Sequence, residues 1–145
     1  RSGHILGSAF ISLYCENKTI VFSGDLGRLN DLVMKTPAQL QHADYILIES
    51  TYGDRLHAKT DPLVQIGKII NETAAQGGKI IIPSFAVGRT QSLLYYIYIL
   101  KKEKKIPDIP IFLDSPMAID ATELLCKYKN EVGAKYVNTR ANLLY

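Results

Sequence analysis

The chain has 145 residues, enough for one ordinary domain or for parts of two. Its apolar fraction of 47% and charged fraction of 21% are typical of a globular protein and argue against a disordered one. No apolar run approaches the roughly 18 residues that span a bilayer, so we expect no membrane partner. The net charge of +3 tolerates a polyanionic partner without requiring one.

The two ends of the chain do not resemble natural termini. Arg1 stands without an initiator Met, and chemically distinctive residues begin at Gly3. The last residues contain no helix stop or polar tail. We therefore expect an incomplete piece of a longer protein.

The two cysteines, Cys15 and Cys126, stand far apart and outside any Cys-x-x-Cys spacing. This pattern favours two buried, reduced thiols over a disulfide or a metal site. A cytoplasmic location is the matching expectation.

The first elements predict a small antiparallel unit. Residues 9–14 and 19–22 are rich in β-forming residues, and the turn-like residues 16–18 separate them, so a hairpin is expected. Residues 44–49 form a nearly continuous apolar run, which predicts a strand buried on both faces.

Helices and strands then alternate along the chain. The first helix is expected after the N-cap candidates Thr60 and Asp61, and it should stop at Gly77 and Gly78. A second helix should follow Gly88, and a third should span about 118–129, with strands at 79–82 and 110–113. This order predicts an α/β fold with a parallel, helix-covered sheet and a domain junction soon after residue 55. The inner faces expected for the second and third helices are Leu93, Leu94, Ile97 and Leu100, and Ala121, Leu124, Leu125 and Tyr128.

Three candidate metal-site residues lie beside predicted strands, where α/β sheets place their ligand sites. A lone histidine such as His4 is usually a surface or core residue, although imidazole is also a common zinc ligand. Asp25 between glycines is a turn residue by default, yet a carboxylate can bridge two metal ions about 3.5–4 Å apart. Glu49 ends an apolar strand and either supports a metal site or pairs with Arg55.

A fourth segment predicts phosphate binding. Ser84, Gly88 and Arg89 lie where a strand is expected to enter a helix, and free N–H groups, the helix dipole and a guanidinium together favour phosphate. An ordinary strand-to-helix connection explains the segment equally well. Farther along, Asp114 or Ser115 is expected to cap the third helix.

Together, the order and the residues of these motifs identify a family more specifically than any single motif does. The series GHILGSA, SGDLGR, ESTYGDR, IPSFAVGRTQ and FLDSPMA resembles the β-CASP branch of the metallo-β-lactamase superfamily, whose members process RNA and in some cases DNA. The resemblance implies that residues 1–54 are the C-terminal part of the first metallo-β-lactamase segment, within an αββα sandwich. Residues 55–145 would then be the N-terminal part of the β-CASP domain.

The resemblance also implies roles for the candidate residues. His4 matches a ligand of one zinc ion, and Asp25 matches the carboxylate that bridges two zinc ions. Glu49 matches an acidic residue that supports the metal site, so Asp25 and Glu49 are the expected catalytic residues. Ser84, Gly88 and Arg89 match a loop well placed to hold RNA phosphates.

Parts of the family pattern do not occur in this sequence. The His-x-His-x-Asp-His motif expected before His4 is missing, as are the later β-CASP motifs with a proton-donating histidine. His42 and His57 do not stand in for them. Because zinc takes about four ligands, we expect no stable two-zinc site and no turnover from the isolated chain.

The expected function is therefore that of the intact protein: a zinc-dependent ribonuclease that acts on RNA in the cytoplasm, with a homodimer as a further expectation. One rival is a hydrolase of small thioesters or lactams, which the IPSFAVGRTQ and FLDSPMA segments argue against. Another is a catalytically dead β-CASP subunit that scaffolds an RNA-processing complex, and the intact His4 and Asp25 argue against it. The sequence does not decide between RNA and DNA as the substrate, or between endonuclease and exonuclease action.

Overall fold

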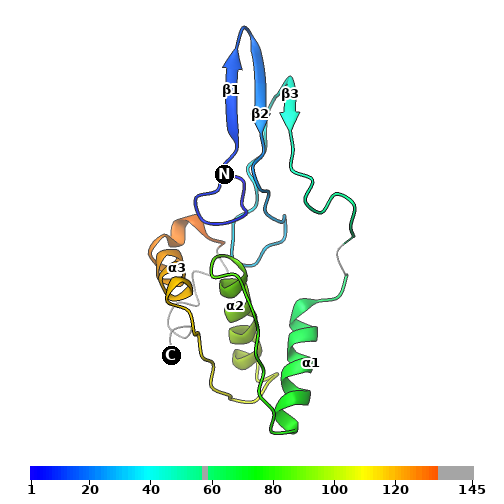
Figure 1. Cartoon of the computed structure of the whole chain (residues 1–145), viewed down its shortest axis with the longest axis vertical. Coiled ribbons are helices and arrows are strands. Elements are labelled where there is room, and N and C mark those ends of the chain that lie inside the picture. Colours follow the sequence, from blue (N-terminus) through cyan, green and yellow to red (C-terminus); the bar gives the residue numbers. More distant parts are fainter. Residues whose placement is uncertain (57–58, 134–145) are drawn as a thin grey trace.

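The structure is a computed structural model that describes residues 1–56 and 59–133. It contains a three-stranded sheet and three α-helices. The sheet stands at one end of the molecule and the helices lie at the other (Figure 1). The elements are β1 (Ile11–Cys15), β2 (Lys18–Phe22), β3 (Tyr45–Leu47), α1 (Pro62–Ala75), α2 (Arg89–Lys102), α3 (Pro116–Lys127) and the 3₁₀ helix η1 (Lys129–Glu131).

The predicted hairpin is confirmed. β1 and β2 pair antiparallel in a register that places Cys15 opposite Lys18. The two residues between the strands, Glu16 and Asn17, have φ of 46° and 64°, the left-handed values of a two-residue hairpin turn. The hairpin is therefore closed by a turn whose twist matches that of its strands.

β3 joins the hairpin through a parallel pairing with β2. Asp44 fixes the start of this pairing, because its Oδ2 accepts a hydrogen bond from the Thr19 N–H at 2.8 Å and its own N–H donates to the Thr19 carbonyl at 2.9 Å. The Lys18 Nζ adds an ion pair with Asp44 Oδ1 at 3.1 Å. Asp44, the residue just before β3, therefore sets the register of that strand against β2.

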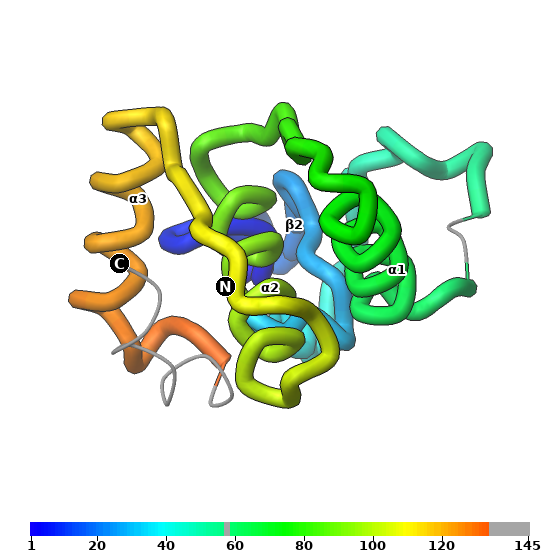
Figure 2. The backbone as a smooth tube through the Cα atoms, turned by 90° about the horizontal axis from the view of Figure 1, so that it is seen from below, coloured from blue at the N-terminus to red at the C-terminus, as the bar shows by residue number. Residues whose placement is uncertain are grey.

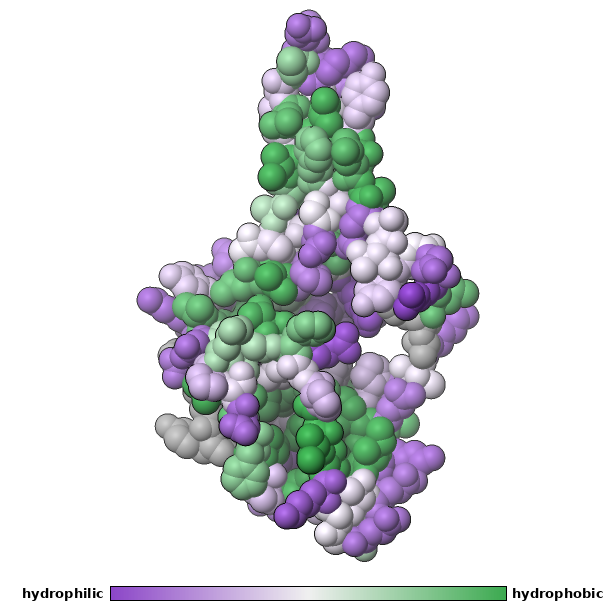
Figure 3. Space-filling model, in the orientation of Figure 1, coloured by the Kyte–Doolittle hydropathy of each residue, from purple (hydrophilic) through white to green (hydrophobic). Residues whose placement is uncertain are grey.

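The prediction that this strand is buried on both faces is wrong. Tyr45, Ile46 and Leu47 are 58%, 54% and 52% exposed. A parallel strand is buried only where helices cover both faces of its sheet, and the helices in the described part of the chain lie at the far end. Figure 3 shows apolar side chains gathered on this uncovered lobe.

The expectation of two buried thiols is wrong for one of them. Cys15 ends β1 and is exposed, because no element packs over β1 among the described residues. Cys126 is buried in α3 as expected, and neither cysteine forms a disulfide in the described part of the chain.

The predicted helices are confirmed, and so are the residues that start and stop them. Asp61 caps α1 by accepting from the Leu63 N–H at 2.9 Å, and Pro62 occupies the first turn. Just beyond the C-cap of α1, Gly77 adopts a φ of +66°, which favours glycine. Ser115 caps α3 through the Ala118 N–H at 3.2 Å.

α2 lies between α1 and α3 (Figure 2). The contact with α1 is close because Gly67 is buried against Leu100, where a Cβ at residue 67 would lie 3.3 Å from the leucine side chain. One core cluster lies at this contact and consists of Ile70, Ile97, Leu100 and Ile106. No helix in the described ranges is long and apolar enough to span a membrane.

A second core cluster joins the loop after β2 to the helices. It consists of Val33, Met34, Tyr95, Leu125 and Val132, and Met34 forms an isolated antiparallel bridge with Val132. Residues on both sides of the predicted junction near residue 55 therefore share one core. The boundary between 1–54 and 55–145 stays a prediction.

The strands predicted at 79–82 and 110–113 are not formed. Both segments lack a neighbouring strand among the described residues, and Ile81 and Phe112 are 89% and 86% exposed. A strand requires a hydrogen-bonding partner, so an apolar, β-favouring sequence alone does not make one. The described residues of the second half therefore form no parallel sheet, and the parallel pairing in this structure is that of β2 with β3 in the first half.

The inner face predicted for α3 is also partly wrong. Leu124 and Tyr128 are 50% and 49% exposed, whereas Leu125 is buried as expected. The buried stripe is Ala118, Thr122 and Leu125, with the i, i+4, i+7 spacing of one helix face. Because Thr122 is polar, the apolar pattern of the sequence does not reveal this face. On α2, the predicted Leu94, Ile97 and Leu100 are buried and Leu93 is half-buried.

Candidate active site

His4, Asp25 and Glu49 lie at the same edge of the sheet. His4 precedes β1, Asp25 follows β2 and Glu49 follows β3. Because β1 is antiparallel and β3 parallel to β2, these three strand ends meet at the edge that faces the helices. The Ser23 N–H donates to the Leu47 carbonyl at 2.9 Å, which holds the two exits from the sheet side by side.

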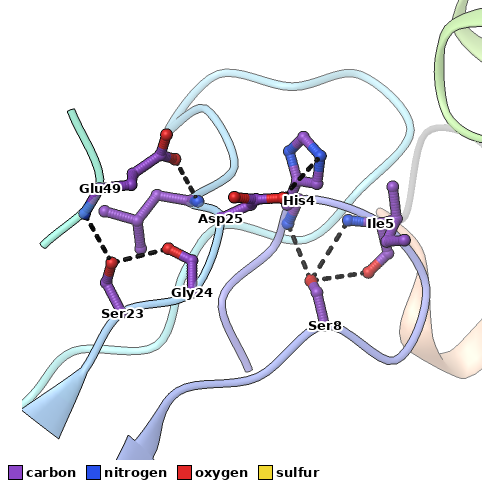
Figure 4. Close-up of polar contacts among 8 residues, drawn as sticks. His4, Ile5, Ser8, Ser23, Gly24, Asp25 and Glu49 are labelled. Atoms are coloured by element: carbon purple, nitrogen blue, oxygen red, sulfur yellow. Dashed lines mark hydrogen bonds and ion pairs between the residues drawn. The ribbon is translucent and has the colours of Figure 1, made fainter. Parts of the chain in front are cut away.

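The side chains of His4 and Asp25 point toward each other (Figure 4). The His4 Nε2 and Asp25 Oδ2 atoms are 3.9 Å apart, and the side chains are 47% and 69% exposed. Two ligands of one tetrahedral zinc lie about 3.3 Å apart at bond lengths near 2.0–2.1 Å, so a small rotation of either side chain would suit a shared ion. The pair therefore fits part of a metal site.

The described residues supply no more than this part. No group of three or more His, Cys, Asp or Glu side chains that could hold a metal ion occurs within 1–56 and 59–133. His42 lies elsewhere, where its Nε2 is 3.7 Å from Asp44 Oδ2. His57 falls outside the described residues.

Ser8 closes the loop that carries His4. Its hydroxyl oxygen accepts from the N–H groups of His4 at 3.0 Å and Ile5 at 3.2 Å, and the hydroxyl donates to the Ile5 carbonyl at 2.8 Å (Figure 4). The His4 backbone is thereby fixed independently of its side chain. The motif GHILGSA contains Ser8, but its spacing alone did not reveal this role.

The His4 loop and the Asp25 loop also touch through their backbones. Gly3 forms an isolated antiparallel bridge with Leu26, and the Gly27 N–H donates to the Ser2 carbonyl at 2.9 Å. The two loops are therefore held together by main-chain contacts of the two residues that follow Asp25.

Glu49 supports the Asp25 loop through two hydrogen bonds. Its Oε1 accepts from the Leu26 N–H at 2.6 Å, and its own N–H donates to the Ser23 hydroxyl at 3.0 Å. The Leu26 N–H, followed by the Thr51 side chain, lowers the pKa of Glu49, and positive charge on His4 acts in the same direction. Glu49 thus stays ionised and orients the residue next to Asp25, while Arg55 pairs with Asp54 at 3.4 Å.

The predicted phosphate loop lies next to the His4 loop. Gly88 is the N-cap of α2 with a φ of +84°, and a Cβ at this position would lie 3.4 Å from the Ile5 side chain. Ser84 and Arg89 are exposed. The contact at Ile5 therefore places the backbone of this loop beside the His4 loop.

The expectation of free N–H groups in this loop is wrong for three of them. The Gly88 N–H donates to Gln91 Oε1 at 2.6 Å, the Arg89 N–H to the Val87 carbonyl at 3.2 Å, and the Thr90 N–H to the Phe85 carbonyl at 3.3 Å. These three N–H groups already donate within the tight turn and the start of α2. The features that remain for the predicted phosphate binding are the Arg89 side chain, the Ser84 hydroxyl and the helix dipole.

Comparison with known proteins agrees with this arrangement. Residues 90–142 match the Beta-Casp domain family. The chain is 44% identical over 119 residues to Ribonuclease TTHA0252 of Thermus thermophilus, a match that covers 81% of this chain and 27% of the relative. It is 36% identical over 145 residues to the RNase J-like protein of Methanocaldococcus jannaschii, covering 97% of this chain and 34% of the relative.

A eukaryotic relative shows the same likeness. Cleavage and polyadenylation specificity factor subunit 3-I of Arabidopsis thaliana is 33% identical over 120 residues, covering 81% of this chain and 17% of the relative. The chain therefore spans between 17% and 34% of the length of these three proteins. The motif order, the convergence of His4, Asp25 and Glu49 and these matches together show that the chain belongs to the β-CASP family of the metallo-β-lactamase superfamily.

Proposed function

We propose that the protein containing this chain is a metal-dependent hydrolase that cuts the phosphodiester backbone of RNA. The observation that carries the proposal is the His4–Asp25 pair, 3.9 Å apart at an edge where Glu49 orients the Asp25 loop. Support comes from the names of the relatives, which include a ribonuclease and an RNase J-like protein. An exposed pair of this kind has no packing role, which favours a ligand role.

The proposed metal is zinc, with two ions in the intact protein. His4 would bind one ion, and Asp25 would bridge both with its two carboxylate oxygens. When bound, such ions activate a water molecule and stabilise charge on the phosphate. The contribution of this chain is to hold the loop that carries Asp25 in place through the bond from the Leu26 N–H to Glu49. The remaining ligands would come from outside this sequence.

The proposed fold of the intact protein explains the uncovered apolar surfaces. Residues 1–54 would belong to the first metallo-β-lactamase segment, and further layers of the αββα sandwich would cover the exposed β3. Residues 55–145 would begin the β-CASP domain, where 79–82 and 110–113 would pair with further strands. The exposure of Ile81 and Phe112 fits this proposal.

RNA is the proposed partner, held by its phosphates. Arg89 would neutralise phosphates near the metal site, Ser84 would donate a hydrogen bond, and Gly88 would allow the close approach of this loop to Ile5. Binding by such contacts weakens as salt rises, because counterions are released from the nucleic acid. A cytoplasmic location and a homodimer complete the proposal.

A cleavage assay with the protein that contains this chain tests the proposed function. RNA and DNA oligonucleotides of the same sequence are incubated with the purified protein, after chelation and again after zinc is restored. We expect RNA to be cut only with metal, and Arg89→Ala to raise the KM for RNA while Arg55→Ala leaves it unchanged. Cleavage that survives chelation would contradict the proposal. RNA binding without cleavage in the presence of zinc would favour the scaffold alternative.

A further inference from the structure

We infer that Gln91 is a positioning residue that sets the phosphate loop, residues 84–89, against the His4 loop; the inference rests on the proposed function. Gln91 is 0% exposed, although its side chain is polar and lies in the first turn of α2. A buried amide is costly unless its donors and acceptor are all satisfied. The partners of Gln91 therefore indicate what it is there to hold.

Each end of the Gln91 amide has a partner of the right kind. Oε1 accepts from the Gly88 N–H at 2.6 Å, and Nε2 donates to the Ala86 carbonyl at 2.9 Å. Because a backbone N–H only donates and a carbonyl only accepts, these two partners fix which way the amide points. One side chain thus spans the turn from residue 86 to residue 88.

Gln91 also ties this turn to α3. Its Nε2 lies 3.1 Å from the Thr122 Oγ1, and that hydroxyl donates to the Ala118 carbonyl at 2.7 Å. Thr122 is itself 0% exposed. The network therefore joins the phosphate loop to a neighbouring helix through groups that water does not reach.

The turn held by Gln91 has an unusual backbone. Gly88 has a φ of +84°, and the Arg89 N–H bonds back to the Val87 carbonyl at 3.2 Å. This conformation brings Gly88 against Ile5, the neighbour of His4. Loss of the Gln91 amide would free the turn, and the backbone that carries Arg89 would lose its fixed place relative to the His4 loop.

Kinetics of the intact protein separate positioning from simple stabilisation. Gln91→Met keeps the approximate volume of the side chain and removes every hydrogen bond of the amide. We expect it to raise the KM for an RNA oligonucleotide about tenfold, with kcat within about twofold, because it weakens a binding contact and leaves the metal ligands in place. Gln65→Met, at an exposed position on α1, is the matched control and should change neither constant.

A double-mutant cycle tests whether Gln91 acts through Arg89. In an Arg89→Ala background, Gln91→Met should raise KM less than about twofold, because the group it positions is already gone. A KM effect that multiplies fully with that of Arg89→Ala would overturn the inference. So would a fall in kcat at unchanged KM, which is the result expected if the substitution only lowers the folded fraction.

Hydrogen exchange tests the positioning role without RNA, so it separates failure of this inference from failure of the proposed function. In Gln91→Met, the amides of residues 86–89 should exchange about tenfold faster, while the α1 amides keep their wild-type rates. Unchanged exchange in 86–89 would overturn the inference even if the protein cleaves RNA. Faster exchange there in a protein without RNA cleavage would support the positioning of the loop and would contradict only the proposed function.

Discussion

Gly27 lies against the backbone of Gly3, so closely that a Cβ atom on residue 27 would overlap the Gly3 carbonyl and lie 2.8 Å from the His4 nitrogen. The contact joins the loop that carries Asp25 to the loop that carries His4. Only a residue without a side chain fits between them. The second glycine of the SGDLGR motif, Gly27, therefore allows the close spacing of the loops that carry the two candidate ligands.

The Gly27→Ala substitution should separate these loops. A displacement of about 1 Å at a reacting centre can cost about 100-fold in rate, so we expect a loss of RNA cleavage of that order in the intact protein. Activity is measured with an RNA oligonucleotide under saturating zinc. Gly133→Ala is the control, because a Cβ there meets its nearest neighbour at an ordinary 3.4 Å. Equal activity of the Gly27 and Gly133 variants would show that the close contact does not matter.

Glu49 variants test the brace behind Asp25. Glu49→Ala removes the acceptor of the Leu26 N–H and should lower metal affinity or activity by about 10- to 100-fold, the usual cost of losing a group that orients a ligand. Glu49→Gln keeps an oxygen for that N–H and should lose less. Metal content and RNA cleavage are measured side by side. If Glu49→Gln is as damaging as Glu49→Ala, the charge of Glu49 matters beyond its hydrogen bond.

Asp44 should make the sheet sensitive to acid. The Thr19 N–H, followed by the Lys18 ammonium, lowers the pKa of Asp44 in the folded chain. A lowered carboxyl pKa contributes stability above the unfolded value of about 3.9, and this stability is lost as pH falls through the folded pKa. The difference in unfolding midpoint between wild type and Asp44→Asn should therefore be largest above about pH 5 and shrink below about pH 4. A difference that is constant from pH 7 to pH 3 would contradict this assignment.

The isolated 145-residue chain should not cleave RNA. Its described residues bring two ligand side chains together, whereas zinc takes about four. Incubation of the chain with zinc and end-labelled RNA should give no product above a no-protein blank. Cleavage above that blank, abolished by Asp25→Ala, would show that this chain holds a complete site.

The sequence predicted the local features that depend on few neighbours. Three such features each depend on a few neighbouring residues, and the structure has all of them: the hairpin turn at Glu16 and Asn17, the cap at Asp61 and the helix start after Gly88. Burial was predicted less well. Tyr45 to Leu47 read as a buried strand, but burial depends on layers that the described residues do not contain.

The candidate site shows the same division. His4, Asp25 and Glu49 were identified from their motifs, and the strand order then explains why they meet at one edge. The supporting groups were missed, because a serine at position 8 or a glutamine at position 91 looks like any other polar residue in sequence. Their roles depend on partners three to 31 residues away. Such partners are visible only once the chain is folded.

Substitution of Asp25 tests the central claim most directly, namely that this strand edge carries part of a metal-dependent RNA-cleaving site. Bound zinc and RNA cleavage are measured for the intact protein as wild type, Asp25→Ala and Asp120→Ala, an exposed aspartate on α3 that serves as the control. We predict that Asp25→Ala loses bound zinc and lowers cleavage by about 1,000-fold or more, while Asp120→Ala matches wild type. Cleavage by Asp25→Ala within tenfold of wild type, with its zinc retained, would contradict the account.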